Sequence, residues 1–448
     1  MELRSLYHLF SRTGFGTNPS EAEKWKDFNV KEMAARLVNP NTRGVGLSTA
    51  EKRSLPGKQA LQNMSPEEKK ELLKEANGKI RDLNTDWMKR LVVSENPLLE
   101  KTTLFWHGHF SCRIGNPYTL QELNNLMREM AFAPFKDLLL AVSKSAAMLQ
   151  FLSNRQNHKL HPNENFAREL MELFTIGRGN YSEDDIKESA RAFTGWSFVP
   201  GSFEFHFNER DHDDGTKTFM GKTGNFTGED IINIILERKE TAQFLTKKLY
   251  RFFVSESFPE ARLTELSDFY YQCNYDTGAL LTKIFASTWF YEPANQGCLI
   301  KSPVELLVGF SRTIGMVPSN EVLLKMQRAL GQMLFFPPNV AGWPGGKSWI
   351  DSSTLMLRLK LPSLILNGGK IDIMEKDEMP EESFNLPDTL SVKPDSKPFF
   401  VNEMPEAILT CLIRPELSDK KSSLLLQSNE SKKQLVLKLM SIPEYQMA

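Results

Sequence analysis

The sequence has few cysteines, and they form no motif. Its 448 residues include only four, Cys112, Cys273, Cys298 and Cys411, and none belongs to a CxxC pair. Zinc ribbons and thioredoxin-like redox sites both need closely spaced cysteines, so the sequence excludes both classes. Four scattered thiols also fit a reducing compartment slightly better than an oxidising one.

An excess of one charge is also absent. The chain has 55 basic and 56 acidic side chains, and its formal net charge is -1. It therefore carries neither the basic footprint of a nucleic-acid-binding protein nor a polybasic membrane patch. We predict no nucleic-acid partner.

Long apolar runs are missing as well. No run approaches the roughly 18 residues that a transmembrane helix needs, so we predict no transmembrane segment. The residues after Met1 contain no long apolar stretch of the kind found in signal peptides. We therefore expect a cytoplasmic protein, with a periplasmic or exported location as the alternative if a signal has been removed.

Helix signals, by contrast, are abundant. Ser65-Pro66-Glu67-Glu68 and Ser302-Pro303-Val304-Glu305 each combine a capping Ser, a Pro in the first turn and a Glu three residues after the Ser. The first predicts a helix that runs to about Val93, and the second a helix that Gly315 closes. Further starts are predicted at Asn96-Pro97, Thr119, Pro134, Ser182, Gly228 and Ser319.

Strand signals are confined to one region. Phe203 to Phe207 alternates apolar and polar residues with period two, and Trp196 to Pro200 is its predicted hairpin partner. Residues 208–228 are rich in Gly, Asp, Lys and Thr, which predicts a long loop. We therefore predict a mainly α protein, a large multi-helix globular fold with one small β-hairpin insertion.

Composition divides the chain into three predicted parts. Residues 1–368 form a helical core domain with the hairpin and loop insertion near 196–228. Residues 369–401 are acidic and contain Pro, which indicates a linker or excursion. Residues 402–448 return to a helical pattern and form a C-terminal helical segment.

Two histidines flank a glycine in Trp106-His107-Gly108-His109. Such a pair suggests a metal site, but side chains at i and i+2 of a helix point about 200° apart. Both histidines therefore cannot bind one ion unless the helix unwinds, and we expect at most one to face a site. The alternative is one histidine in the core and the other at the surface.

The segment after His161-Pro162 is the densest in polar groups. Its predicted helix carries Glu164, Asn165, Arg168 and Glu172, with Glu164 and Arg168 at the i,i+4 spacing that favours an ion pair. If these groups are buried, they must pair or bind a ligand, so a Glu here is a candidate acid or base. A solvated helix face and a buried structural ion-pair network are the alternatives.

A loop of mixed charge follows the predicted hairpin. It contains His212, Asp213 and Lys217, which together offer acceptors for a cation and donors for an anion. The loop lacks the ligand spacing of an EF-hand. It is therefore a candidate substrate loop or cation site, or a structural loop held by Asx turns.

The last candidate is the turn Phe336 to Trp349. Its Gly346-Lys347-Ser348 resembles the end of a phosphate-binding loop, but Ala341 stands where the first Gly is required, so we exclude a nucleotide site. Trp343 is a candidate for stacking on a sugar ring. A buried aromatic turn is the structural alternative.

Several motifs in a fixed order identify a family resemblance. They are His8–Gly16, Phe105–Phe110, Asn163–Leu170 with Glu172 and Gly177, Ala192–Trp196, His212-Asp213 with Lys217–Phe219, Lys301–Glu305 and Pro337–Gly346. With them the chain resembles the bacterial domain-of-unknown-function 1800 family. The resemblance covers roughly residues 1–365 and leaves the tail outside. Two departures are Gly108, where Asn is usual, and Phe174, where His is common, which argues against a metal site that needs a ligand at 174.

The resemblance implies little chemistry, because the family has no established reaction. It implies a gene neighbourhood shared with a second family that resembles alkaline phosphatases and sulfatases. That neighbourhood suggests work on a polysaccharide or the cell envelope, and a partner protein of that second family.

The leading hypothesis is a hydrolase or lyase that acts on a saccharide or envelope-type substrate in one polar pocket. A carboxylate or histidine would serve as acid and base, Arg168 would orient it or bind an anionic group, and a divalent cation would fit as a cofactor. The predicted catalytic residues are His109, Glu164, Arg168 and Glu172, and the predicted substrate-binding residues are His107, Asn165, His212, Asp213, Lys217 and Trp343.

Two other classes stay open at this point. One is a non-catalytic binding or assembly protein that acts with a partner protein. The other is a redox metalloenzyme, which needs at least three convergent nitrogen or oxygen ligands.

The substitution Glu164→Gln separates the first two hypotheses. The enzyme hypothesis predicts loss of activity with folding intact, because the acid–base group is removed while its shape is kept. The assembly hypothesis predicts destabilisation by about 3–5 kcal/mol, because a broken buried pair leaves an uncompensated charge. Activity assays and chemical denaturation of the same variant measure both.

Overall fold

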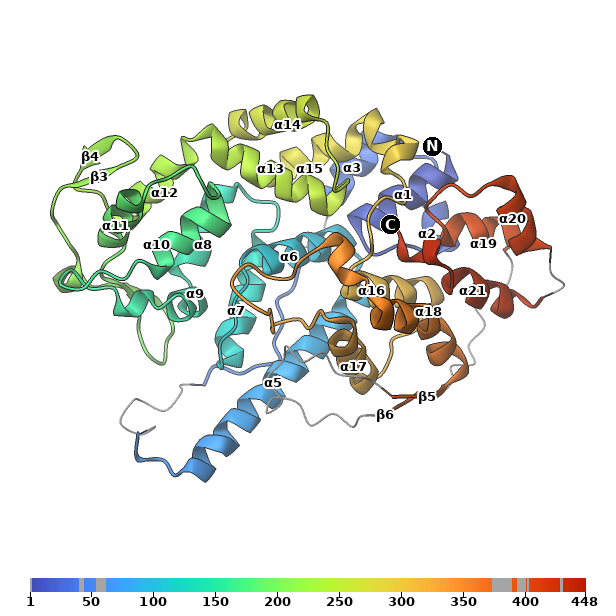
Figure 1. Cartoon of the computed structure of the whole chain (residues 1–448), viewed down its shortest axis with the longest axis horizontal. Coiled ribbons are helices and arrows are strands. Elements are labelled where there is room, and N and C mark those ends of the chain that lie inside the picture. Colours follow the sequence, from blue (N-terminus) through green and yellow to red (C-terminus); the bar gives the residue numbers. More distant parts are fainter. Residues whose placement is uncertain are drawn as a thin grey trace.

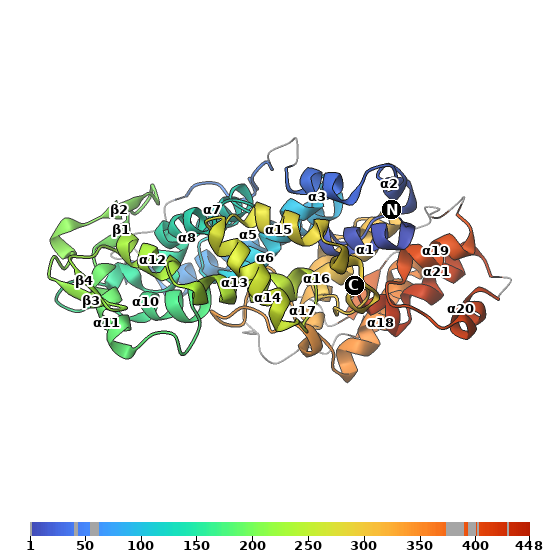
Figure 2. The ribbon, with the colours of Figure 1, turned by 90° about the horizontal axis from the view of Figure 1, so that it is seen from above.

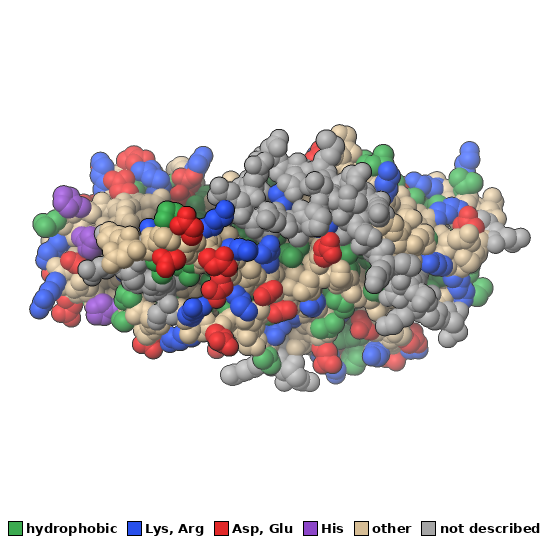
Figure 3. Space-filling view, turned by 90° about the horizontal axis from the view of Figure 1, so that it is seen from below, with side chains coloured by type: hydrophobic (Ala, Val, Ile, Leu, Met, Phe, Trp, Pro, Cys, Tyr) green, Lys and Arg blue, Asp and Glu red, His purple; other side chains and the backbone are tan. Residues whose placement is uncertain are grey.

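The computed structural model describes residues 2–39, 44–53, 62–372, 389–392, 400, 403–427 and 430–448. The described chain is mainly α-helical, as predicted, and elongated (Figures 1 and 2). The strand pairs within residues 196–224 lie at one end, and the first and last helices lie together at the other. Acidic and basic side chains are interspersed over the described part of the face shown in Figure 3, in line with the balanced composition.

Most predicted helix starts are confirmed. Ser65 and Ser302 both form complete capping boxes, and Gly315 closes its helix with a left-handed φ of 71°. The helices of the first half are α1 (Leu3–Thr13), α2 (Pro19–Glu23), α3 (Val30–Val38), α5 (Pro66–Val93), α6 (Pro97–His109), α7 (Pro117–Glu129), α8 (Phe135–Lys144), α9 (Ala146–Phe151), α10 (Asn165–Glu169) and α11 (Glu183–Ala192).

The second half of the chain is also mainly helical. Its helices are α12 (Gly228–Leu236), α13 (Lys239–Phe253), α14 (Glu260–Gln272), α15 (Thr277–Ala286), α16 (Pro303–Ile314), α17 (Asn320–Leu330), α18 (Ser352–Asn367), α19 (Pro405–Leu412), α20 (Asp419–Leu426) and α21 (Lys432–Met440). Short 3₁₀ turns are η1 (Asn154–Gln156), η3 (Glu209–Asp211), η4 (Thr288–Tyr291), η5 (Pro293–Asn295), η6 (Gly346–Trp349) and η8 (Pro443–Gln446).

The predicted hairpin forms, and two further strand pairs accompany it. β1 (Trp196–Phe198) and β2 (Phe205–Phe207) are antiparallel, with Ser197 opposite His206. The loop predicted for 208–228 instead contains a second hairpin, β3 (Lys217–Phe219) and β4 (Lys222–Gly224). The predicted linker 369–401 lies largely outside the described residues, but its described parts form β5 (Gly369–Asp372) and β6 (Thr389–Val392).

Helix α6 runs through the centre of the molecule and is buried on every side (Figure 1). Its charged side chains are therefore paired. Glu100 accepts hydrogen bonds from Arg128 Nε at 2.9 Å and from the Trp87 indole at 2.9 Å, which ties α6 to α7 and α5. Lys101 pairs with Glu305 of α16 at 2.9 Å and donates to the carbonyl oxygen of Ser11 at the end of α1.

The two ends of the chain pack against each other. The Arg4 guanidinium donates to the carbonyl oxygen of Arg414, and the Cys411 thiol donates to that of Thr17. The described residues near the C-terminus form the helices α19, α20 and α21, which lie beside α1 (Figure 2). Within the part of the chain that the structure describes, no helix has the length and apolar character to cross a bilayer.

Glu100→Gln tests the central role of α6. Because it leaves the buried Arg128 without its carboxylate, we expect a loss of about 3–5 kcal/mol in the free energy of unfolding, measured by chemical denaturation. The matched control is Glu23→Gln, which breaks the exposed pair with Lys26 and should leave the free energy of unfolding nearly unchanged. Equal losses for the two variants would contradict this description of the core.

Candidate functional site

A cavity of about 530 Å³ lies beside the C-terminal half of α6. It is walled by α6, by α13, by the start of α16 and by the turn 341–349. Its lining includes Phe105, His109, Lys248, Arg251, Phe252, Glu256, Glu305, Trp343 and Trp349. Aromatic surface with a few polar groups is the usual character of a small-molecule site.

Glycines seat the turn 341–349 against α6. Gly342 has a φ of +81°, and a Cβ there would lie 2.5 Å from the carbonyl oxygen of Gly108. A Cβ at Gly346 would lie 1.6 Å from Glu256 Oε1. Close backbone approach at both points therefore holds the turn over the cavity and brings the Glu256 carboxylate against it.

His109 lies in the cavity wall with its tautomer fixed. Its Nε2 is 3.0 Å from the carbonyl oxygen of Phe174, which can only accept, so Nε2 carries the hydrogen and Nδ1 is the acceptor. Phe174 belongs to η2 (Leu170–Thr175), a π-helical turn that continues α10. Burial, followed by the nearby Lys248, holds the pKa of His109 well below its usual value, so the ring is neutral.

Lys248 completes this arrangement. Its Nζ is 3.2 Å from His109 Nδ1 and donates to the carbonyl oxygen of Leu173 at 2.9 Å. No carboxylate of the described residues forms an ion pair with it, and burial lowers the pKa of Lys248 to about 8. The π-helical turn thus presents two adjacent carbonyl oxygens, one to His109 and one to Lys248.

Two carboxylates also line the cavity. Glu305 forms an ion pair with Lys101 and accepts a hydrogen bond from the N–H of Ser302. Burial opposes its ionisation, but Lys101 and Ser302 outweigh burial and lower the pKa of Glu305. Glu256 is exposed at the wall, which leaves it the freer of the two carboxylates.

The predicted polar helix lies at another place. Arg168 pairs with Glu164 at 3.0 Å, as the spacing predicted, and with Glu183 of α11 at 2.9 Å. The side chains of Arg168 and Glu164 are 35% and 38% exposed, so the pair is a solvated one worth at most about 1 kcal/mol. The exposed pair of Arg168 and Glu164 is therefore neither the buried acid or base nor the buried ion-pair network that the sequence analysis considered.

Glu172 and Asn165 have structural contacts of their own. Glu172 pairs with Arg178 and accepts from the Tyr181 hydroxyl. The Asn165 amide donates to the carbonyl oxygen of Leu152. Neither residue is among those that line the cavity.

The charged loop is tied to α11 rather than to the cavity. Asp213 pairs with Arg191 at 2.7 Å, and this guanidinium holds the pKa of Asp213 below its usual value. His212 is buried with Nδ1 2.9 Å from the carbonyl oxygen of Thr194. The Lys217 ammonium donates to the carbonyl oxygens of Asp213 and Gly215, so the loop is closed on itself.

His107 is buried in the core, so neither histidine of the pair lies at the surface. Its Nε2 accepts from the N–H of Phe335 at 3.1 Å, and its ring packs on Trp87 and Trp343. Burial lowers the pKa of His107 to about 3, so the ring stays neutral. The i,i+2 spacing predicted that at most one of the two histidines faces a site, and only His109 lines the cavity.

The predicted residues therefore separate into two places. His109 and Trp343 line the cavity, whereas Glu164, Arg168 and Asp213 lie on or around α11. The sequence analysis missed Lys248, although Phe244, Lys248 and Phe252 share one face of α13 at i, i+4 and i+8, a lysine within an aromatic stripe. Among the described residues, no three His, Cys, Asp or Glu side chains are grouped so that they could hold a metal ion.

A comparison with known protein families tests the resemblance that the motifs indicate. The family described as protein of unknown function (DUF1800) matches residues 8–447. The chain belongs to this family. The prediction that the resemblance ends near residue 365 is wrong, because the DUF1800 match includes the C-terminal helices. No curated protein and no solved structure matches the chain.

Gly342→Ala tests how the turn closes the cavity. The left-handed backbone and the contact with the Gly108 carbonyl oxygen predict a loss of about 2–4 kcal/mol in unfolding free energy. Gly345→Ala is the matched control, because its φ is −88° and a Cβ there meets nothing within 4 Å. The account of the turn fails if chemical denaturation gives the two variants the same stability.

Proposed function

We propose that this chain is an enzyme that acts on a saccharide in the cavity beside α6, as a hydrolase or lyase. The observation that carries the proposal is the contact between Lys248 Nζ and His109 Nδ1 at 3.2 Å in an aromatic-lined cavity. A half-buried lysine without a carboxylate partner is able to lose its proton near neutral pH, and a base whose pKa lies near the working pH is efficient.

The hydrogen bonds of Lys248 orient its lone pair. A neutral amine has two hydrogens, and the carbonyl oxygen of Leu173 and His109 Nδ1 accept both. The lone pair then points away from these two acceptors. In this arrangement Lys248 is the base, and His109 is a positioning residue held by the Phe174 carbonyl oxygen.

The other cavity residues supply the remaining roles. Glu256 is proposed to accept hydrogen bonds from substrate hydroxyls, since its carboxylate is exposed at the wall and has no basic partner among the described residues. Trp343 and Trp349 offer faces on which a sugar ring stacks, and Arg251 suits an anionic group of the substrate. Arg251 thus takes the role assigned to Arg168 from the sequence.

Two features of the proposal come from the family resemblance and not from the cavity. They are the envelope-type substrate and a partner protein of a phosphatase- or sulfatase-like family. A non-catalytic role with that partner is the second candidate, and the assay below separates it from catalysis.

Lys248→Met tests the proposed base. We expect turnover to fall at least 100-fold, within the range that general bases contribute, while the melting temperature changes little. Activity is sought on a panel of acidic and neutral polysaccharides, as new reducing ends for hydrolysis and as ultraviolet absorbance of an unsaturated product for elimination.

Lys247→Met is the matched control, because the Lys247 ammonium lies 5.0 Å from the Phe258 ring and does not line the cavity. It should keep full activity. Full activity of Lys248→Met would reject Lys248 as the base. Saccharide binding by the unaltered protein without turnover would favour the non-catalytic role.

A further inference from the structure

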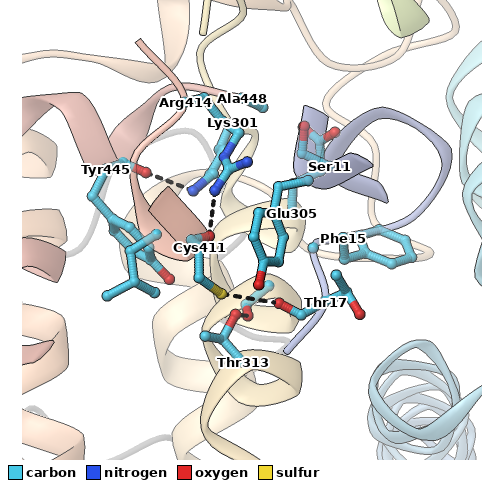
Figure 4. Close-up of a pocket in the computed structure, with 14 residues that line it drawn as sticks. Ser11, Phe15, Thr17, Lys301, Glu305, Thr313, Cys411, Arg414, Tyr445 and Ala448 are labelled. Atoms are coloured by element: carbon cyan, nitrogen blue, oxygen red, sulfur yellow. Dashed lines mark hydrogen bonds between the residues drawn. The ribbon is translucent and has the colours of Figure 1, made fainter. Parts of the chain in front are cut away.

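Among the described residues, the cavity beside α6 lacks the pair of carboxyl groups on which glycoside hydrolysis usually depends. Most glycoside hydrolases place two carboxyl groups across the bond, and one of them must be protonated. Two described carboxylates line the cavity, Glu256 and Glu305. Glu305 also lines a small second cavity between the two ends of the chain (Figure 4), and its ion pair with Lys101 at 2.9 Å keeps it ionised. One free carboxylate remains, which favours elimination over hydrolysis.

A base and a guanidinium stand one turn apart on α13. Lys248 and Arg251 both line the cavity, and side chains three residues apart on a helix are neighbours. Arg251 forms no ion pair with a described carboxylate, and its guanidinium carbon lies 5.4 Å from the centre of the Phe258 ring. Its forked donors match the two oxygens of a carboxylate. The two side chains therefore suit a substrate that carries a C–H bond and a carboxylate on the same carbon.

Removal of a proton next to a carboxylate is difficult, because it adds a second negative charge to the group. A cation held against the carboxylate stabilises that charge as it develops. Lys248 supplies the base, and Arg251 supplies the cation. Uronic acids carry such a carboxylate on C5 of the sugar ring, where loss of the proton leads to release of the sugar attached through O4.

We infer that the cavity cleaves a polyuronate by β-elimination, with Arg251 on the C5 carboxylate and Lys248 at the C5 proton. This inference rests on the proposed function of the same cavity, and it selects the lyase over the hydrolase. Trp343 and Trp349 stack on the sugar rings, as proposed above.

The step needs no co-reactant. The neutral amine of Lys248 takes the C5 proton and becomes an ammonium, while the electron pair of the C–H bond moves into the carboxylate that faces Arg251. That pair then forms the double bond between C4 and C5 as the bond from C4 to the leaving oxygen breaks. The ammonium of Lys248 gives its proton to the leaving oxygen, so the lysine ends neutral and the product is an unsaturated sugar.

The use of one group for both proton transfers selects the stereochemistry of the substrate. Lys248 reaches the C5 hydrogen and the leaving oxygen only if both lie on the same face of the ring. Glucuronate and mannuronate units have this arrangement. Galacturonate, which differs from glucuronate only at C4, and guluronate, which differs from mannuronate only at C5, have the two atoms on opposite faces.

The four polyuronates test the inference on the full chain. We expect the ultraviolet absorbance of an unsaturated product with polyglucuronate or polymannuronate, and none with polygalacturonate or polyguluronate. Polyglucuronate whose carboxylates have been reduced to alcohols should also give none, because it offers Arg251 no anionic group and has no acidified C5 proton. New reducing ends are measured in the same samples.

Arg251→Met should lower the rate of elimination about 100-fold or more, the loss expected when a group that stabilises developing charge is removed, with the melting temperature unchanged. Arg262→Met is the matched control. The Arg262 guanidinium carbon lies 4.3 Å from the centre of the Trp289 ring, and Arg262 does not line the cavity, so this variant should keep the full rate.

New reducing ends without the absorbance, from any polysaccharide, would leave a saccharide enzyme in place and overturn elimination. Equal rates on the four polyuronates would overturn the single-base step, and full activity of Arg251→Met would overturn the role of Arg251. If Arg251→Met does not fold, the comparison of polyglucuronate with its reduced form decides that role on the unaltered protein. No product from any polysaccharide would overturn the inference and the proposed function together.

Discussion

The buried polar side chains of α6 constrain the rest of the structure. Glu100, Lys101, His107 and His109 all lie in the interior, where an unpaired polar group costs several kcal/mol. Each therefore needs a partner from another segment. Glu100 bonds to side chains of α7 and α5, and Lys101 bonds to α16 and to the end of α1. The two histidines form hydrogen bonds with segments on opposite sides of the helix.

The cavity follows from this arrangement. His109 requires the Phe174 carbonyl oxygen, and a regular α-helix that continued past Phe174 would have used that oxygen internally. The π-helical turn and the chain reversal after it release adjacent carbonyl oxygens, and Lys248 takes the one at Leu173. On the far side, His107 fixes the start of the segment that leads into the Gly-rich turn, which closes over the cavity mouth. Irregular helical turns of this kind are frequent at functional sites.

The helices were predictable because their signals are local. The capping boxes at Ser65 and Ser302 and the closing Gly315 each depend on a few neighbouring residues. The hairpin β3–β4 was missed because its strands are three residues long and carry no run of alternation. The burial of both histidines was missed because helical spacing fixes their directions but not which segments cover each side.

The site was predictable only where a motif and the cavity coincide, as at His109 and Trp343. Glu164 and Arg168 carry the most specific motif, yet they form an exposed ion pair on α10, because charge density in a sequence does not distinguish a solvated face from a pocket. Lys248 carries no motif. Its surroundings come from α6, η2 and α13, which are brought together only by the tertiary fold.

The most direct test of this account is the pKa of Lys248, measured by NMR from the Cε chemical shifts of protein that contains ¹³C-labelled lysine and assigned by comparison with Lys248→Met. The account predicts that one lysine signal, absent from the variant, titrates near pH 8. A value near the ordinary lysine pKa of about 10.4 would mean that Lys248 stays charged at neutral pH and only caps the π-helical turn, which would contradict its role as a base.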